Sequence, residues 1–127
     1  MDFPEDLYYT EEHEWIRTED DETARIGVTD FAQRELGDVV FVELDPVGTS
    51  VGDDEPFGTI EAVKTVSDLF MPVSGTIEAH NEALESHPEL VNDDPYGEGW
   101  MVEITIDDPD ELDELLGADE YRSMVQP

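Results

Sequence analysis

The sequence of 127 residues contains no cysteine and no hydrophobic run of membrane-spanning length. Without cysteine the chain forms neither a disulfide framework nor a zinc site built on thiolates, and any sulfur chemistry must come from a cofactor. Residues 1–6 are acidic and carry no apolar run, so neither a secretory signal nor a transit peptide is expected. With no apolar stretch long enough for a spanning helix, we expect a cytoplasmic protein with no membrane partner.

Positive charge is also scarce. Five cations stand against 36 acids, which gives a formal net charge of −31, and 19 of the acids precede the only lysine while 17 follow it. Phosphate contacts need cations, so no nucleic-acid partner is expected. Such an even acidic surface favours adaptation to a salt-rich cytoplasm, as in a halophilic organism, because screening there weakens repulsion. A strongly basic partner, which would call for a focused acidic face, is the less favoured alternative.

The only lysine, Lys64, lies between two segments that have strand composition. Residues 57–63 and 66–71 are rich in β-branched and aromatic side chains, so Lys64 and Thr65 fall at the position of a two-residue hairpin turn. The turn lacks the usual Gly or Asn. The pentapeptide Gly-Thr-Ile-Glu-Ala occurs at 58–62 and again at 75–79, which suggests two related strands, as in a pseudo-symmetric pair. Such a hairpin would hold the Lys64 amine outward at its tip.

The chemistry of this lysine favours attachment over catalysis. A nucleophilic or basic lysine needs its pKa lowered by burial or by a neighbouring cation. Here Glu61, Asp68 and the acidic chain as a whole favour the ammonium form. Lys64 is therefore predicted to be an attachment point that another enzyme acylates. Composition alone leaves a second interpretation open, in which one lysine survives by chance in a chain that avoids lysine.

The rest of the chain predicts many short strands with helices at the edges. Two strands are expected within 8–17, and one each at 23–28, 38–44, 73–79 and 100–106. Helical segments are expected at 30–36, within 86–92, from 109 to Gly117 and at 118–125. The run at 38–44 indicates burial on both faces, and 100–106 alternates with Trp100, Val102, Ile104 and Ile106 on one face. Thr29 and Asp108 are predicted N-caps. Tyr121, Met124 and Val125 share a face of the last helix. The pattern favours a small β-barrel or β-sandwich with a helical C-terminus.

The residues around Lys64 resemble a known family. The pattern Glu61-x-x-Lys64-x-x-Ser67-Asp68 is similar to the lipoyl-attachment region of the glycine cleavage system H protein, and blocks at 12–15, 27–33, 36–43, 72–75, 81–84, 88–92, 94–100 and 115–118 extend the resemblance over nearly the whole chain. Biotin-carrying domains place methionine on both sides of the lysine, unlike this chain. The resemblance implies a mainly β barrel-sandwich hybrid, similar to lipoyl and biotinyl domains, with short flanking helices. It implies one domain, 1–127, with a core of about 7–106 and C-terminal helices at about 109–125.

The resemblance also implies a function. Lipoate on Lys64, attached by a lipoylating enzyme, would receive an aminomethyl group from glycine decarboxylase (P protein) and present it to aminomethyltransferase (T protein). Lipoamide dehydrogenase (L protein) would reoxidise the arm. The chain would be a carrier and not itself an enzyme. Open alternatives are a lipoyl relay or donor, the lipoyl domain of an acyltransferase complex, which would normally belong to a longer chain, and an interaction protein whose lysine is unmodified.

Two further site residues follow from the resemblance. Glu14 and Asp68 match positions that line the pocket of the loaded arm in the family, where carboxylates would hold the aminomethyl cation. Glu12 stands where the family can have a small hydroxyl residue. The three histidines, His13, His80 and His87, have no ligand spacing, so they are expected to be structural or surface residues and no metal is predicted.

Overall fold

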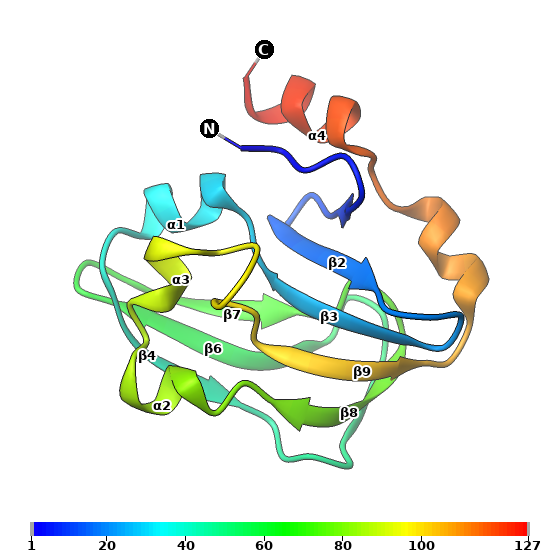
Figure 1. Ribbon diagram of the computed structural model, residues 1–127, viewed down its shortest axis with the longest axis horizontal. Coiled ribbons are helices and arrows are strands. Elements are labelled where there is room, and N and C mark those ends of the chain that lie inside the picture. The colour runs from blue at the N-terminus through cyan, green and yellow to red at the C-terminus, as the bar shows by residue number, and fades with distance from the viewer. Residues whose placement is uncertain (1, 127) are drawn as a thin grey trace.

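The computed structural model describes residues 2–126 and places them in two antiparallel sheets with helical segments around them (Figure 1). The strand order is β1-β2-β3-β9-β8-β5 in the six-stranded sheet and β4-β6-β7 in the three-stranded sheet. The strands are β1 Tyr8–Tyr9, β2 Glu14–Thr18, β3 Thr23–Val28, β4 Val39–Leu44, β5 Ser50–Val51, β6 Pro56–Ala62, β7 Val66–Phe70, β8 Gly75–His80 and β9 Val102–Ile106. The helical segments are α1 Asp30–Leu36, α2 Ala83–Ser86, α3 Leu90–Asp93, the 3-10 helix η1 Pro109–Glu114 and α4 Ala118–Val125.

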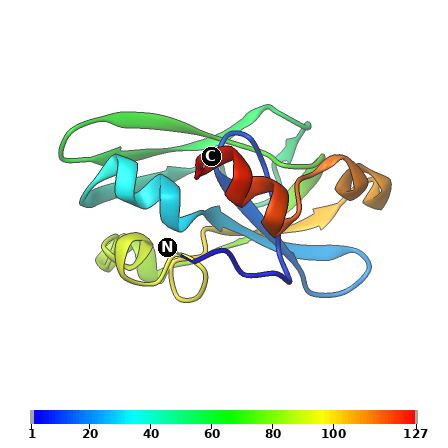
Figure 2. The same ribbon diagram turned by 90° about the horizontal axis from the view of Figure 1, so that it is seen from above.

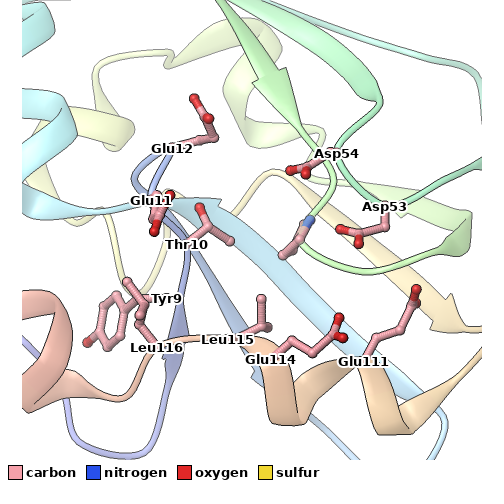
Figure 3. Close-up of a pocket in the computed structure, with 11 residues that line it drawn as sticks. Tyr9, Thr10, Glu11, Glu12, Asp53, Asp54, Glu111, Glu114, Leu115 and Leu116 are labelled. Carbon is pink, nitrogen blue, oxygen red and sulfur yellow. The ribbon is translucent and has the colours of Figure 1, made fainter.

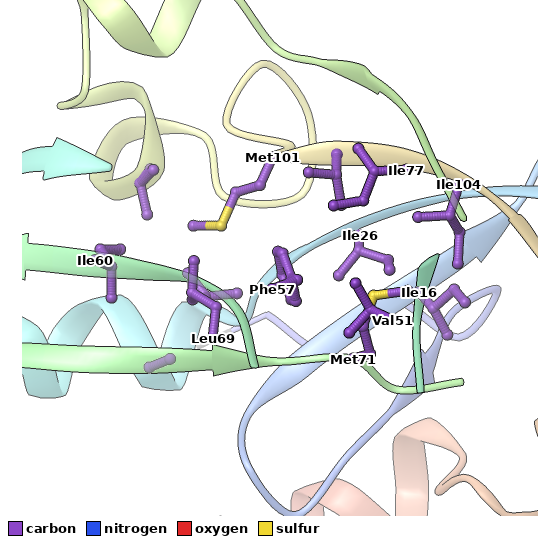
Figure 4. Close-up of a cluster of buried hydrophobic side chains, with 14 of the residues drawn as sticks. Ile16, Ile26, Val51, Phe57, Ile60, Leu69, Met71, Ile77, Met101 and Ile104 are labelled. Carbon is purple, nitrogen blue, oxygen red and sulfur yellow. The ribbon is translucent and has the colours of Figure 1, made fainter. Parts of the chain in front are cut away.

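The main core lies between the two sheets (Figure 4). Ile26 and Ile104 contribute from the larger sheet, and Phe57 and Leu69 from the smaller one, each with at most 1% of its surface exposed. Because side chains alternate along a strand, every second residue of β9 points into this core. The mainly β barrel-sandwich architecture expected from the sequence is confirmed.

A second apolar cluster joins the two ends of the chain. Its buried members are Phe3, Leu7, Tyr9, Trp15, Ala118 and Tyr121. The N-terminal segment and α4 lie side by side in both ribbon views (Figure 1, Figure 2), and the backbones of Tyr9 and Leu116 exchange two hydrogen bonds of 2.8 and 2.9 Å. The C-terminal helix is thereby fixed beside β1 and β2.

The two copies of the pentapeptide occupy comparable places in the two sheets. The first forms most of β6, between β4 and β7, and the second most of β8, between β9 and β5. In both copies the isoleucine is buried. A Cβ on Gly58 would collide with the backbone carbonyl of Glu43, and one on Gly75 would lie 2.5 Å from the carbonyl oxygen of Thr105. Glycine in each copy therefore permits close approach of the neighbouring strand.

The local predictions that concern capping are confirmed. The Ala32 amide donates to the Thr29 hydroxyl at 3.1 Å, and Asp108 accepts from the amide of Asp110 in the same way. The segment behind Asp108, however, is a 3-10 helix that ends at Glu114. The helical turn expected within 86–92 is present as α3, and a further short helix, α2, ends before Pro88, which supplies no backbone N–H to continue it.

Two predictions about strands are wrong. Strand β4 is not buried on both faces: Val40 is 46% and Phe41 53% exposed, because β4 is an edge strand with only one face on the core and an irregular register at this point. Trp100 precedes β9 and is half-buried beside the second cluster. Among residues 2–126, no helix is both long and apolar enough to cross a membrane.

Candidate functional site

The hairpin of β6 and β7 holds Lys64 at its tip. The two strands pair up to Glu61 and Val66, and residues 63–65 connect them, one residue more than predicted. The Ala62 amide donates to the Thr65 carbonyl at 2.8 Å, and the Val63 amide donates to the Asp38 carbonyl at 3.0 Å. No described residue of this connection has a positive φ, which explains how the turn forms without Gly or Asn.

The Lys64 side chain is exposed and runs past the end of helix α1. A Cβ built on Gly37, the residue that follows α1, would lie 3.7 Å from Cε and 3.9 Å from Nζ of Lys64. Gly37 has a φ of +80°, which glycine adopts without strain. Within the described part of the chain, Lys64 forms no salt bridge. Its amine is therefore accessible, and it sits close to the helix end.

Helix α1 and the hairpin strands enclose a cavity of about 150 Å³, which we call the arm cavity. It is lined by Glu12, His13, Glu14, Val28, Ala32, Glu35, Leu36, Ile60, Ser67, Asp68 and Leu69. The aliphatic members come from the core-facing sides of β3, α1, β6 and β7, while most polar members come from the turn before β2 and from β7. An apolar interior with a polar edge suits a hydrocarbon arm that ends in a polar group.

Glu14 is the buried acid of this cavity, with 2% of its surface exposed. The Thr10 hydroxyl donates to its Oε1 at 2.9 Å, and the Phe70 amide approaches its Oε2 at 3.4 Å. Burial raises the pKa of Glu14 to about 8; the two hydrogen bonds lower it, and the nearby acids Glu12 and Asp54 raise it. The carboxyl group is therefore largely protonated at neutral pH. It has no cationic partner among the described residues.

The structure brings Glu14 and Asp68 to one cavity and places Lys64 next to it. Asp68 is exposed and pairs with Thr59 in the β6–β7 ladder. The stem of Lys64 passes Gly37, whose neighbour Leu36 is a wall residue. An arm attached to Nζ therefore begins close to the cavity.

Several lining residues were not predicted from the sequence. In the sequence, Glu35 and the aliphatic wall residues only fit a helix or strand pattern, and nothing else marks them as residues of a cavity. Thr10, which bonds to Glu14 but does not itself line the arm cavity, stands four residues before it, and only the turn at 10–13 brings the two side chains together. His13 lines the cavity with a φ of +71°, a left-handed conformation that few residues other than glycine adopt.

The other two histidines lie elsewhere. Nε2 of His80 is 2.6 Å from the Asp45 carbonyl oxygen, and His87 is exposed, with its Nδ1 3.3 Å from Glu89. In the part of the chain that the structure describes, no group of three or more histidine and acidic side chains has a geometry that could hold a metal ion.

A larger cavity of about 260 Å³ shares the lining residue Glu12 with the arm cavity (Figure 3). The turn before β2, the loop before β6 and η1 contribute six carboxylates to its lining: Glu11, Glu12, Asp53, Asp54, Glu111 and Glu114. The pKa of Asp53 is raised by burial and then by the neighbouring acids. Glu111 accepts hydrogen bonds from the amide and hydroxyl of Ser74. The cavity concentrates like charge and contains neither Lys64 nor Glu14.

Exposed apolar side chains surround the hairpin tip. Val40, Phe41, Val63 and Val66 have between 46% and 73% of their surface exposed, and we call them the hairpin patch. Phe41 pairs with Glu61, and Glu61 pairs with Val66, so these three side chains share one face of the small sheet. Apolar side chains are therefore gathered around Lys64 on an acidic molecule, with the exposed acid Glu61 between Phe41 and Val66.

A barrel-sandwich fold that exposes a lysine at a hairpin tip, beside a cavity lined mainly by apolar side chains, defines a carrier domain of the lipoyl and biotinyl type. The model of the Glycine cleavage H-protein family matches residues 7–127. The glycine cleavage system H protein of Salinibacter ruber is 64% identical over 125 residues, 98% of this chain and 100% of the relative. That of Chlorobium phaeobacteroides is 55% identical over 125 residues, 98% of each chain.

A solved structure agrees with these relatives. The crystal structure of a glycine cleavage system H protein from Mycobacterium marinum matches with a TM-score of 0.85 and 38% identity, over 98% of this chain and 99% of that one. The chain belongs to the glycine cleavage H-protein family, the lipoyl carrier of the glycine cleavage system. A lipoyl relay and an acyltransferase domain are not favoured by these matches, while the adaptation to salt stays a prediction.

Proposed function

We propose that Lys64 carries lipoate in amide linkage to Nζ and that the chain catalyses no step itself. The observation that carries the proposal is the only lysine of the sequence, exposed at a hairpin tip, without an ion pair to any residue of 2–126 and beside a cavity with aliphatic walls. When attached, lipoate supplies the sulfur chemistry that a chain without cysteine lacks. The aliphatic walls, among them Leu36 and Ile60, bind the hydrocarbon part of the arm and exclude water from it.

Glu14 and Asp68 hold the aminomethyl cargo in this proposal. A cargo amine that enters the arm cavity meets a buried carboxyl group with no cation of its own. The ammonium group favours the ionised form of Glu14, and the resulting carboxylate accepts a charge-assisted hydrogen bond from it, which is strengthened by the low local polarity. Asp68 is exposed, so solvent and salt screen its contribution. The buried acid is therefore expected to matter more than the exposed one.

The proposed partners are glycine decarboxylase, aminomethyltransferase, lipoamide dehydrogenase and the lipoylating enzyme. Each of them must bring its active site to the arm or to Nζ of Lys64, and must therefore cover the surface around the hairpin. The hairpin patch supports this contact, because its apolar side chains carry no charge that would have to be desolvated on docking. Tethering keeps the cargo at a high effective concentration for each bound enzyme.

The attachment is tested by peptide mass spectrometry of the protein made in cells with active lipoylation. A lipoyl adduct is expected on Lys64 in the parent, and none in Lys64→Arg, which keeps the charge. A biotinyl adduct, or an unmodified Lys64 in such cells, would refute the proposal.

The cargo site is tested on isolated protein that has been loaded with labelled glycine and glycine decarboxylase. Glu14→Gln should speed the loss of the aminomethyl group by about tenfold, the equivalent of one hydrogen bond to a charged group. Asp68→Asn should speed it by about twofold. Glu98→Gln, a change at an exposed acid outside the arm cavity, is the control and should match the parent. If both cavity variants retain the group as long as the parent does, Glu14 and Asp68 are not cargo ligands.

A further inference from the structure

The hydroxyl of Tyr121, a fully buried residue of the C-terminal helix, connects two parts of the chain that are far apart in the sequence. Its Oη lies 2.8 Å from Nδ1 of His13 and 2.7 Å from Oγ1 of Thr29. No residue of α4 lines the arm cavity. The helix nevertheless reaches both of that cavity's walls through this one oxygen atom.

The first partner belongs to the turn that carries the acids. His13 lines the arm cavity between Glu12 and Glu14. Its backbone has a φ of +71°, a conformation that an L-residue keeps only where its surroundings fix it. The imidazole ring also packs 4.8 Å from the ring of Phe31 in α1. Loss of a contact to this ring would therefore change the conformation of the turn and the position of Glu14.

The second partner fixes the start of helix α1. Thr29 accepts a hydrogen bond from the Ala32 amide as the N-cap of the helix, and its own amide donates to the His13 carbonyl at 3.0 Å. Helix α1 in turn supplies Ala32, Glu35 and Leu36 to the arm cavity. Tyr121 thus bonds to Thr29, which orients the wall formed by α1, and to His13, which belongs to the other wall. The backbone hydrogen bond from Thr29 to His13 also joins the two walls.

The position of Tyr121 is set outside the cavity. Its ring stacks on Tyr9 at 4.8 Å with an interplanar angle of 5°, and it meets Phe3 edge-on at 5.8 Å. Both partners belong to the second apolar cluster, which holds α4 against the N-terminal segment. The hydroxyl is therefore presented to His13 and Thr29 from a rigid support.

The protons can be placed along this network. Thr29 Oγ1 accepts from the Ala32 amide, and Tyr121 Oη is the one acceptor for its own proton among the described residues, so we assign the Thr29 proton to Tyr121 Oη and the Tyr121 proton to Nδ1 of His13. The imidazole then carries its own proton on Nε2. Burial lowers the pKa of His13, against the influence of Glu12 and Glu35, so the ring is neutral near pH 7. A neutral ring in the wall does not repel a cationic cargo.

We propose that Tyr121 is a positioning residue for the arm cavity, whose hydroxyl orients the His13 ring and the first turn of α1 so that the two walls together retain the loaded arm. This inference rests on the proposed function of the cavity. It assigns a role in carriage to the C-terminal helix, which contributes no residue to the cavity lining.

The matched pair Tyr121→Phe and Tyr9→Phe tests this role. Both changes remove one buried hydroxyl and keep the same ring stack, but the Tyr9 hydroxyl bonds to the Pro4 carbonyl at 2.6 Å and not to a cavity wall. Both should lower the melting temperature to a similar extent. In the release assay, Tyr121→Phe should speed loss of the aminomethyl group by about fivefold to tenfold, since two neutral hydrogen bonds are lost. Tyr9→Phe should stay within about twofold of the parent.

A second measurement reports on the ring itself. Nitrogen-15 NMR of the parent should show His13 as the neutral tautomer with its proton on Nε2, and Tyr9→Phe should keep that signature. Tyr121→Phe should shift it towards a mixture of tautomers. Unchanged His13 signals in Tyr121→Phe, or equal acceleration of release in both variants, would overturn the inference and leave the proposed function intact. If the unsubstituted loaded protein fails to retain the group, the proposed function falls, and this inference with it.

Discussion

The buried carboxyl group of Glu14 should make the stability of the protein depend on pH in an unusual direction. Its pKa of about 8 in the fold compares with an ordinary value of 4.5. The folded state therefore binds more protons than the unfolded state between these values, and the free energy of unfolding falls as pH rises through that window. At about 1.36 kcal/mol per pH unit, the loss between pH 4.5 and pH 8 is on the order of 4 kcal/mol.

Glu14→Gln removes the titrating group and keeps its shape. The amide satisfies only one of the donors Thr10 and Phe70, so we expect the variant to be about 1 kcal/mol less stable than the parent near pH 5. Near pH 8.5 the order should reverse, with the variant more stable by a few kcal/mol, because the parent must then ionise an acid in the core.

Denaturant unfolding of parent and variant at half-unit steps between pH 5 and pH 9, at one fixed high salt concentration, measures this difference. The other acids cancel because they are common to both proteins. Glu98→Gln removes an exposed acid and sets the baseline, which should be flat. A difference between Glu14→Gln and the parent that does not change with pH would show that Glu14 is ionised in the fold, and the reasoning about its burial would be wrong.

Three further expectations concern the surface and the sheets. The folded state should become markedly less stable at low salt, because 36 acids stand against five cations. The Debye length grows from about 3 Å at about 1 M salt to about 30 Å at about 0.01 M, so the acids then repel one another over longer distances. A melting temperature that is the same across potassium chloride concentrations would exclude the predicted salt adaptation. Phe41→Ser in the hairpin patch should lower the kcat/KM of lipoylation by about tenfold, as for an aromatic contact residue, while Val47→Ser, an equally exposed site outside the patch, should not. Gly58→Ala should cost more than about 2 kcal/mol in unfolding experiments, because its Cβ would meet the backbone of β4; Gly117→Ala, with its nearest atom at 3.6 Å, should cost less than about 1 kcal/mol.

Features that depend on neighbours along the chain could be predicted from the sequence. The helix at Asp30–Leu36 behind Thr29, the hairpin around Lys64 and the buried stripe of β9 all follow from short-range capping, propensity and alternation. Lys64, the proposed attachment residue, stands out for the same reason, since its type and its flanks are enough to single it out. The resemblance to the family was confirmed because it rests on many separate blocks, each of which is local.

Features that depend on which surfaces meet were decided only by the tertiary structure. The apolar run of β4 looked buried on both faces, but the sheet that receives it has only one face on the core, so Val40 and Phe41 remain exposed. The burial of Glu14 cannot be seen in a chain with 36 acids, because residues 54 and 70 reach it only after the sheets have packed. The bond from Tyr121 to His13 spans 108 positions. The sequence by itself therefore determined the elements and singled out Lys64 at the hairpin tip, whereas the packing of distant segments decided which acid is buried and what holds the cavity walls.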